Sequence, residues 1–305
     1  MAAPLPGQSS TEAFELGGWS FEARITPIWG TDRLEDVARA NNLCEVPDMF
    51  CGDAGITFTH LASGTRLELS AIDALRCLVF RPPPLGLQPA PWETDTEGPL
   101  LGAVKCQFAS KWRPQNDNPD VKEIDVLSDW TCSSSYWGSW LEGEGSCLAE
   151  QETSEGLPFD LLRQRDEIKW YQEVLFWEDE LSDNGFCRAS VRVRVMPSFW
   201  FALLTCELRV DGVLIREVAT RLFCSFHSNE VLREWTWREA SYKTLRGRGV
   251  QFADNPHISQ VNVGTSLLSD ADVRQRYRHA IRIASADTGI RDGSADGGAG
   301  SGETD

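Results

Sequence analysis

The chain has 305 residues, 41% of them hydrophobic, and carries 46 acidic against 29 basic residues, a formal net charge of -17. The apolar content is enough for a large core, and the negative charge disfavours nucleic acid and anionic membrane surfaces as partners. The short basic stretch "YKTLRGRGV" is interpreted as a solvated loop. No signal peptide or apolar run of ~20 residues is visible, so we expect a cytoplasmic protein, with the nucleus as the second compartment.

The first hundred residues predict strands and two helices. Residues 1–12 are rich in Pro, Gly and Ser, and we expect them to lack regular structure. Alternation predicts a strand in "GGWSFEARITPIW", and helical spacing with Thr31 as N-cap predicts a helix in "TDRLEDVARANNL". Two strands flank Ser63-Gly64. Ser70 and Asp73 form a capping-box pattern that begins a short helix, and the Pro-rich segment 81–99 is interpreted as a loop or an insertion.

The middle of the chain predicts strand-like pieces and one long helix. The strand-like pieces are "GAVKCQF" and "DWTCSSSYWGSWLE". The helix is expected to begin near Pro158 and to end at Gly185, which suits a left-handed C-cap. On a helical wheel most apolar residues of this segment share one arc, but Glu178 falls inside the arc and Phe176 falls among the polar residues.

The last third contains the strongest fold signal. "ASVRVRVMP" alternates strictly, and two long strands follow that are joined at Asp211-Gly212, a pair typical of a two-residue hairpin turn. Residues after 286 are rich in Gly, Asp and Ser and are expected to lack regular structure. Strands dominate without regular βαβ units, so the sequence predicts an α+β protein with antiparallel sheet, forming a single domain over residues 13–285.

Motifs for catalysis or cofactor binding are not visible in the sequence. It contains no GxSxG, Walker, GxGxxG or HExxH pattern. Nine cysteines without CxxC spacing are interpreted as reduced core residues, and four isolated histidines give no zinc pattern, so we expect no metal and no cofactor. Twelve tryptophans are compatible with a binding cleft but are more typical of a core.

One acidic group has three open interpretations. Glu178, Asp179 and Glu180 could serve as a general acid and base, with Glu178 made less acidic by its apolar surroundings. They are more typical of a solvated helix end, with Glu178 bonded to an arginine, or of a protein-binding surface. A β-rich hydrolase or ligand-binding protein that uses these acids and an aromatic cleft is therefore the alternative function.

Several stretches, taken together and in order, resemble the TIPRL family, the TOR-signalling-pathway regulator-like proteins. They are "DALRC", "SDWTCSSSYWG", "LRQRDEIKWYQEVLFWEDELSDNG", "VRVRVMPSFWFALL" and "LRVDGVLIREVATRL", and the resemblance extends from about residue 15 to 265. It implies a non-catalytic monomer that binds and restrains the catalytic subunits of type-2A Ser/Thr protein phosphatases in nutrient and stress signalling. It also implies a family-specific α+β fold with a cleft for the C-terminal tail of the catalytic subunit.

The resemblance also implies partner-binding positions. Asp73, Leu157, Glu217 and Ala219 align with such positions, and Arg216 lies next to two of them. Because an acid and an aromatic out of phase on a helix suit a partner-binding face, Phe176, Glu178, Asp179 and Glu180 join this set. The sequence departs from the family at Ala219, where an Asp is usual, and at Cys51, where an aromatic residue is expected.

Overall fold

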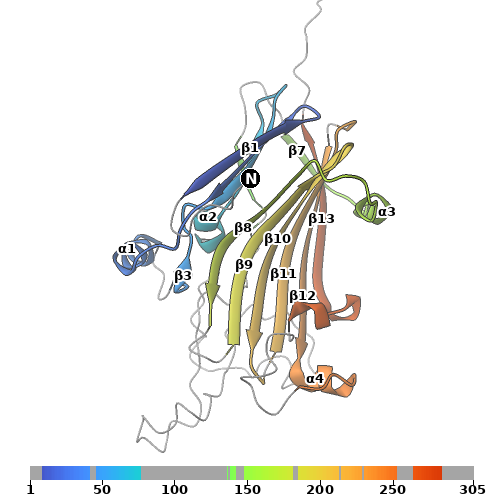
Figure 1. Ribbon diagram of the computed structural model, residues 1–305. Coiled ribbons are helices and arrows are strands. Elements are labelled where there is room, and N and C mark those ends of the chain that lie inside the picture. Colours follow the sequence, from blue (N-terminus) through green and yellow to red (C-terminus); the bar gives the residue numbers. More distant parts are fainter. Residues whose placement is uncertain are drawn as a thin grey trace, which may run out of the picture.

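The computed structural model describes residues 9–41, 46–76, 136, 138–141, 148–180, 185–212, 214–228, 230–252 and 264–283. Two antiparallel sheets face each other, with the helices at their edges and ends (Figure 1). This confirms the α+β class and its antiparallel pairing. The predicted strand at 102–108, the Pro-rich segment 81–99 and the segment after 286 lie outside the described residues.

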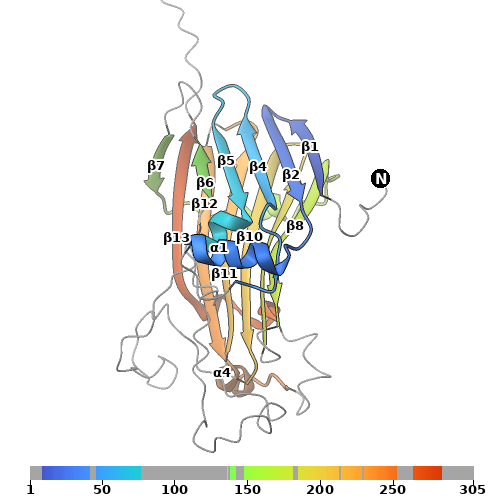
Figure 2. The ribbon, with the colours of Figure 1, turned by 90° about the vertical axis from the view of Figure 1, so that its left-hand side faces the viewer.

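The smaller sheet has five strands in the order β1-β2-β4-β5-β6. Their bounds are Ser10–Leu16, Trp19–Ile25, Gly55–His60, Arg66–Ser70 and Ser139–Leu141. Helix α1 (Thr31–Asn41) follows β2, and helix α2 (Ala71–Arg76) follows β5. The sheet covers only part of the longer strands behind it (Figure 2).

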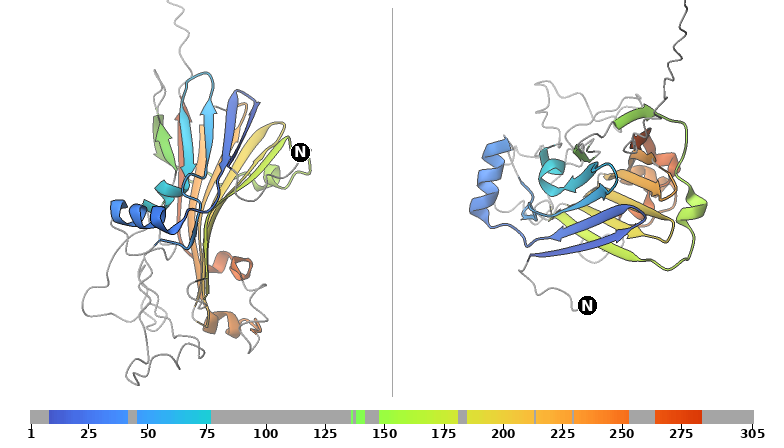
Figure 3. Two further views of the ribbon diagram at one scale, coloured as in Figure 1. Left: turned by 60° about the vertical axis from the view of Figure 1, so that its left-hand side comes forward. Right: turned by 90° about the horizontal axis from the view of Figure 1, so that it is seen from above.

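The larger sheet has eight strands in the order β3-β8-β9-β10-β11-β12-β13-β7. In chain order these strands are β3 (Met49–Phe50), β7 (Leu148–Glu152), β8 (Trp170–Asp179), β9 (Gly185–Val195), β10 (Phe199–Val210), β11 (Leu214–Ser225), β12 (Glu230–Ser241) and β13 (Val273–Ile283). Seen from above, the smaller sheet lies across these strands (Figure 3).

The main core lies between the two sheets and is rich in aromatic rings. Trp200 of β10 is fully buried and stacks on Phe58 of β4, with ring centroids 4.7 Å apart. Trp19 of β2 meets the same indole edge-on at 5.2 Å. The tryptophans whose burial the structure describes are all buried or partly buried, so they build the core rather than an open aromatic cleft.

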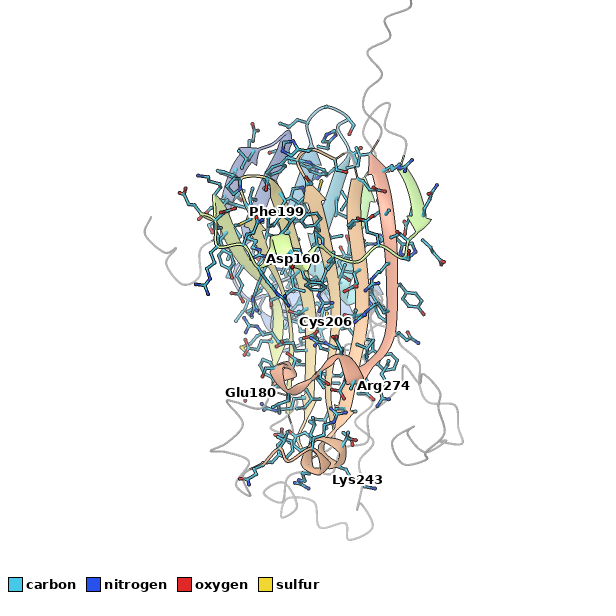
Figure 4. The ribbon with its side chains drawn as sticks, turned by 90° about the vertical axis from the view of Figure 1, so that its right-hand side faces the viewer. Asp160, Glu180, Phe199, Cys206, Lys243 and Arg274 are labelled. Atoms are coloured by element: carbon cyan, nitrogen blue, oxygen red, sulfur yellow. The ribbon has the colours of Figure 1, made fainter. Side chains whose placement is uncertain are left out.

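The outer face of the larger sheet is crossed by two segments (Figure 4). At one end helix α3 (Phe159–Leu162) packs against a cluster of buried residues, namely Leu157, Met196, Phe199 and Phe223. At the other end helix α4 (Tyr242–Gly247) and the 3-10 turns η3 (Thr265–Leu267) and η4 (Asp270–Asp272) accompany a second cluster around Ile215 and Ala240. Between them the outer face of the sheet carries mostly polar and charged side chains.

The prediction of one long helix from Pro158 to Gly185 is wrong. Only Phe159–Leu162 is helical, residues 170–179 form strand β8, and Gly185 begins strand β9 instead of capping a helix. A β-bulge between Leu175 and Trp177 explains the error, because it interrupts the period-2 alternation that marks a strand. The bulged residue, Phe176, is fully buried.

The other local predictions fit the structure better. Helices α1 and α2 and both hairpins form where the sequence places them, but Val210 pairs with Leu214, so the second turn spans three residues instead of the predicted two. Gly64 and Gly212 have φ of 69° and 76°, the left-handed conformation that these turns require and that glycine adopts without steric cost. Strand β1, however, begins at Ser10, so residues 10–12 belong to the smaller sheet and not to a segment without structure.

Two further findings concern cysteines and membranes. The described cysteines, Cys51, Cys187, Cys206 and Cys224, are all in the thiol form and buried. Burial raises the pKa of the Cys224 thiol to about 12, which fits a reduced core residue of low reactivity.

No helix among the described residues has the length and apolar character needed to span a membrane.

Candidate functional site

Asp73 lies in the first turn of α2, where the sequence places it. Its backbone N–H donates to the Ser70 hydroxyl, 3.2 Å away, which is the N-cap hydrogen bond expected for this pair. The half-buried Asp73 side chain helps to line an open cavity of about 480 Å³ at the end of the smaller sheet. The cap therefore fixes the helix, and the helix in turn presents a carboxylate to this cavity.

The cavity is polar. Besides Asp73, it is lined by Ser9, Ser10, Thr11, Arg24, Thr26, Gly52, Asp53, Ala54, Glu68, Ser70 and Ile72. Two of its carboxylates are paired with arginines: Glu68 bonds Arg24, and Asp53 lies 2.8 Å from Arg33. Hydroxyls and carboxylates dominate the lining, so the cavity is suited to hydrogen bonding with a polar protein segment. We call it the Asp73 cavity.

Three other predicted partner contacts lie inside the protein. Leu157 is 6% exposed and packs with the cluster beneath α3, while Phe176 and Ala219 are 0% exposed. Side chains this deeply buried shape the surface above them and expose almost no surface of their own in this structure. The solvent-facing position expected for Phe176 is thus corrected, because in a strand with a bulge this side chain points into the core.

The acids at 178–180 are separated by the strand geometry. Glu178 is half-buried on the outer face opposite Arg188, and Glu180 is exposed. Asp179 is 5% exposed and accepts a hydrogen bond from the Asp48 backbone N–H, 2.9 Å away. Neighbouring side chains of a strand point to opposite faces, so Glu178 and Asp179 do not form the acid and base pair of the hydrolase interpretation.

Arg216 and Glu217 also point to opposite faces, of β11. Arg216 is fully buried on the core side, where its Nε lies 2.7 Å from an oxygen of Glu239. Glu217 is 5% exposed on the outer face, bonds Arg238 and lies 3.6 Å from Arg221. Of the predicted residues, only Glu217 and Glu178 thus lie on the outer face of the larger sheet with polar side chains.

Sequence reasoning missed the charged group that Glu217 belongs to. Arg221, Arg238, Arg276 and Arg278 surround Glu217 and Glu234 on the outer face of β11, β12 and β13. The alternating arginines in "VRQRYRHAIRI" indicate that one face of this strand is polar. The spacing of residues along the sequence does not show, however, that β11, β12 and β13 pair and bring these charges together. Among the described residues, no group of three His, Cys, Asp or Glu side chains could hold a metal ion.

The fold and the Asp73 cavity define an α+β two-sheet protein whose described residues form an open polar cavity suited to contacts with protein. The family described as TIP41-like matches residues 49–246. The chain is 34% identical over 239 residues to the TIP41-like protein of Homo sapiens, covering 78% of this chain and 80% of that protein. It is also 30% identical over 248 residues to the TIP41-like protein of Arabidopsis thaliana, covering 76% and 78%.

A yeast relative has a more specific name. The Type 2A phosphatase activator TIP41 of Saccharomyces cerevisiae is 28% identical over 248 residues, which cover 80% of this chain and 67% of that protein. The chain therefore belongs to the TIP41-like family. This confirms the resemblance that the sequence motifs indicated.

Proposed function

We propose that this chain is a regulator of type-2A Ser/Thr protein phosphatases, which binds their catalytic subunits through the face that carries the Asp73 cavity. Membership of the TIP41-like family carries the proposal, together with the name of the yeast relative. The cavity adds an exposed polar surface at a residue that the family resemblance singles out. The C-terminal tail of the catalytic subunit is the segment that we assign to it.

The direction of regulation is part of the proposal. The sequence resemblance implies restraint, whereas the yeast relative is named an activator. A protein that holds the catalytic subunit without touching its reacting atoms needs no catalytic residue of its own. We therefore propose a stoichiometric, non-catalytic and monomeric regulator that restrains the phosphatase, acting in the cytoplasm and the nucleus.

A binding and activity assay tests this function. The full chain is mixed with a purified type-2A catalytic subunit, with and without its C-terminal tail, and the complex is separated by gel filtration. We expect a one-to-one complex with the intact subunit, weaker binding without the tail, and phosphatase activity that falls as the chain is added. Absence of any complex would refute the proposal, and a rise in activity would refute restraint.

A further inference from the structure

The position of Asp73 depends on a tyrosine that does not itself belong to the described lining of the cavity. Ser70 is the last residue of β5, and its hydroxyl accepts a hydrogen bond from the Asp73 backbone N–H at the start of α2, with 3.2 Å between the two atoms. The Ser70 backbone N–H is donated in turn to the Tyr136 hydroxyl, also 3.2 Å away. Tyr136 therefore acts on Asp73 through Ser70.

The Tyr136 hydroxyl takes the place of a missing strand at the end of β5. Strand β6 pairs with β5 only at Arg66, Leu67 and Glu68. Beyond these pairs the Tyr136 hydroxyl donates to the Glu68 carbonyl and accepts from the Ser70 N–H, each 3.2 Å away. A phenol has one proton to donate and can accept as well, so this single group serves both backbone groups. Because buried backbone groups are costly without partners, the hydroxyl fixes the end of β5 where α2 begins.

Tyr136 is held by the larger sheet. Its backbone carbonyl accepts a hydrogen bond from the Thr220 hydroxyl at 2.7 Å, and Thr220 is 2% exposed on the inner face of β11. Gly138 lets the chain pass close to β5, since its φ is 98° and a Cβ there would lie 2.7 Å from the Leu67 side chain. Tyr136 thus bridges the two sheets, with its backbone bonded to β11 and its hydroxyl bonded to β5.

Both residues that the Tyr136 hydroxyl bonds belong to the cavity lining. The Glu68 side chain lines the cavity and bonds Arg24, and the Ser70 side chain lines it beside Asp73. Loss of the hydroxyl frees the Glu68 carbonyl and the Ser70 N–H together, at the point where the chain turns from strand into helix. A carboxylate displaced by about 1 Å no longer meets a partner group at hydrogen-bonding distance. The direction of the Asp73 carboxylate therefore depends on Tyr136.

We propose that Tyr136 is a positioning residue for phosphatase binding, because its hydroxyl sets, through Ser70, the direction in which α2 presents the Asp73 carboxylate. The inference rests on the proposed function, since it assumes that Asp73 contacts the catalytic subunit. Tyr136 is 6% exposed and acts from inside the protein. A purely structural role would lower the stability of the fold and leave the affinity of the folded protein unchanged.

A double-mutant cycle separates the two roles. Isothermal titration calorimetry against a purified type-2A catalytic subunit measures the affinity of the full chain, Tyr136→Phe, Asp73→Asn and the double variant. We expect Tyr136→Phe to weaken binding by about three- to tenfold, the equivalent of one neutral hydrogen bond. In the Asp73→Asn background the same change should have no further effect, because the carboxylate that Tyr136 directs is absent. Unchanged affinity of Tyr136→Phe, or an equal loss in both backgrounds, would overturn the proposal.

Hydrogen–deuterium exchange of the free chain measures the positioning without the phosphatase. In Tyr136→Phe the backbone amides of residues 69–76 should exchange about tenfold faster, since the end of β5 and α2 open more often, whereas β12 should exchange as in the wild type. Faster exchange at 69–76 without any binding of the phosphatase by the wild type would refute the proposed function but support the positioning of Asp73 by Tyr136. Unchanged exchange at 69–76 would overturn the positioning role.

The matched control is Tyr242→Phe. Tyr242 is also 6% exposed, and its hydroxyl donates to Asp211, 3.3 Å away, at the end of the larger sheet that lies farthest from the smaller sheet (Figure 1). This variant loses a comparable hydrogen bond and should keep the wild-type affinity and the wild-type exchange at 69–76. An equal loss of affinity in Tyr242→Phe would reveal a general effect of lost stability and would overturn the proposal.

Thr220→Val is the second variant, for the case that Tyr136→Phe does not fold. It removes the hydrogen bond to the Tyr136 backbone carbonyl and keeps the Tyr136 hydroxyl. Because the hydroxyl is then less firmly placed against Ser70, this variant should also weaken binding of the catalytic subunit and speed exchange at 69–76. Wild-type values of both in folded Thr220→Val would overturn the proposal.

Discussion

The two faces of the larger sheet are built from the same strands but differ in chemistry. On the inner face Trp200, Val218 and Trp235 belong to one continuous core shared with the smaller sheet. On the outer face the same strands carry Glu217, Arg221 and Glu234, which are buried or partly buried without being part of an apolar core. Alternation of side chains along each strand produces both faces at once.

The difference shows that burial has two separate sources in this protein. Where the smaller sheet covers it (Figure 2), the inner face is buried against that sheet, and apolar area removed from water stabilises this part of the core. The middle of the outer face is buried because long arginine side chains cover the glutamates and small residues between them. The inner face should therefore respond to changes of volume, and the outer face to changes of charge.

The largest expected effect concerns the inner face. Trp200 is fully buried and contacts rings from β2 and β4 of the smaller sheet. Trp200→Ala leaves a cavity between the sheets and should lower the free energy of unfolding by about 3–5 kcal/mol. Chemical denaturation monitored by circular dichroism measures this loss.

The matched surface variant is Tyr171→Ala. Tyr171 lies on the outer face of β8 and is 50% exposed. Its replacement should change the free energy of unfolding by less than about 0.5 kcal/mol. Similar losses for the two variants would show that Trp200 does not join the sheets as described.

A smaller effect is expected on the outer face. Glu217→Gln removes the negative charge that contacts Arg238 and Arg221. It should lower the free energy of unfolding by about 1–3 kcal/mol, because charged hydrogen bonds of a nearly buried side chain are lost. The same substitution at Glu173, which contacts Arg188 and Arg192 but is 35% exposed, should cost under about 1 kcal/mol. Equal melting temperatures for Glu217→Gln and the wild type would contradict a structural role for Glu217.

The sequence was sufficient for features set by local chemistry. Asp211-Gly212 specifies its hairpin because the turn needs a positive φ at Gly212, and Ser70 specifies the start of α2 through its cap. The strand at 170–179 was mistaken for a helix because the bulge at Phe176 disturbs its alternation. The charged group around Glu217 and Glu234 was not predictable, since Glu217, Glu234 and Arg276 meet only through strand pairing.

The smallest expected effect is a pH dependence at the end of the outer face. Burial raises the pKa of Asp272, but hydrogen bonds from Arg248 and Ser269 outweigh burial and lower it below the usual value. Because the folded pKa lies below the unfolded one, this carboxylate stabilises the fold above its unfolded pKa of about 4 and loses that contribution as the pH falls.

The variant Asp272→Asn isolates this contribution. The wild type should be more stable than Asp272→Asn at neutral pH, and the difference should shrink as the pH is lowered below about 4. Thermal unfolding of both proteins across this pH range measures the difference. A difference that stays constant with pH would show that the Asp272 charge contributes nothing.

The central claim is that the Asp73 cavity contacts the phosphatase, and isothermal titration calorimetry of Asp73→Asn against a purified type-2A catalytic subunit tests it most directly. The control Glu167→Gln removes a carboxylate that is 78% exposed and lies outside the cavity lining, and it should leave both stability and affinity nearly unchanged. Asp73→Asn should lower the affinity by well over about tenfold while the melting curve barely moves, because an interfacial charge is removed. Equal affinities for Asp73→Asn and the wild type would contradict the account.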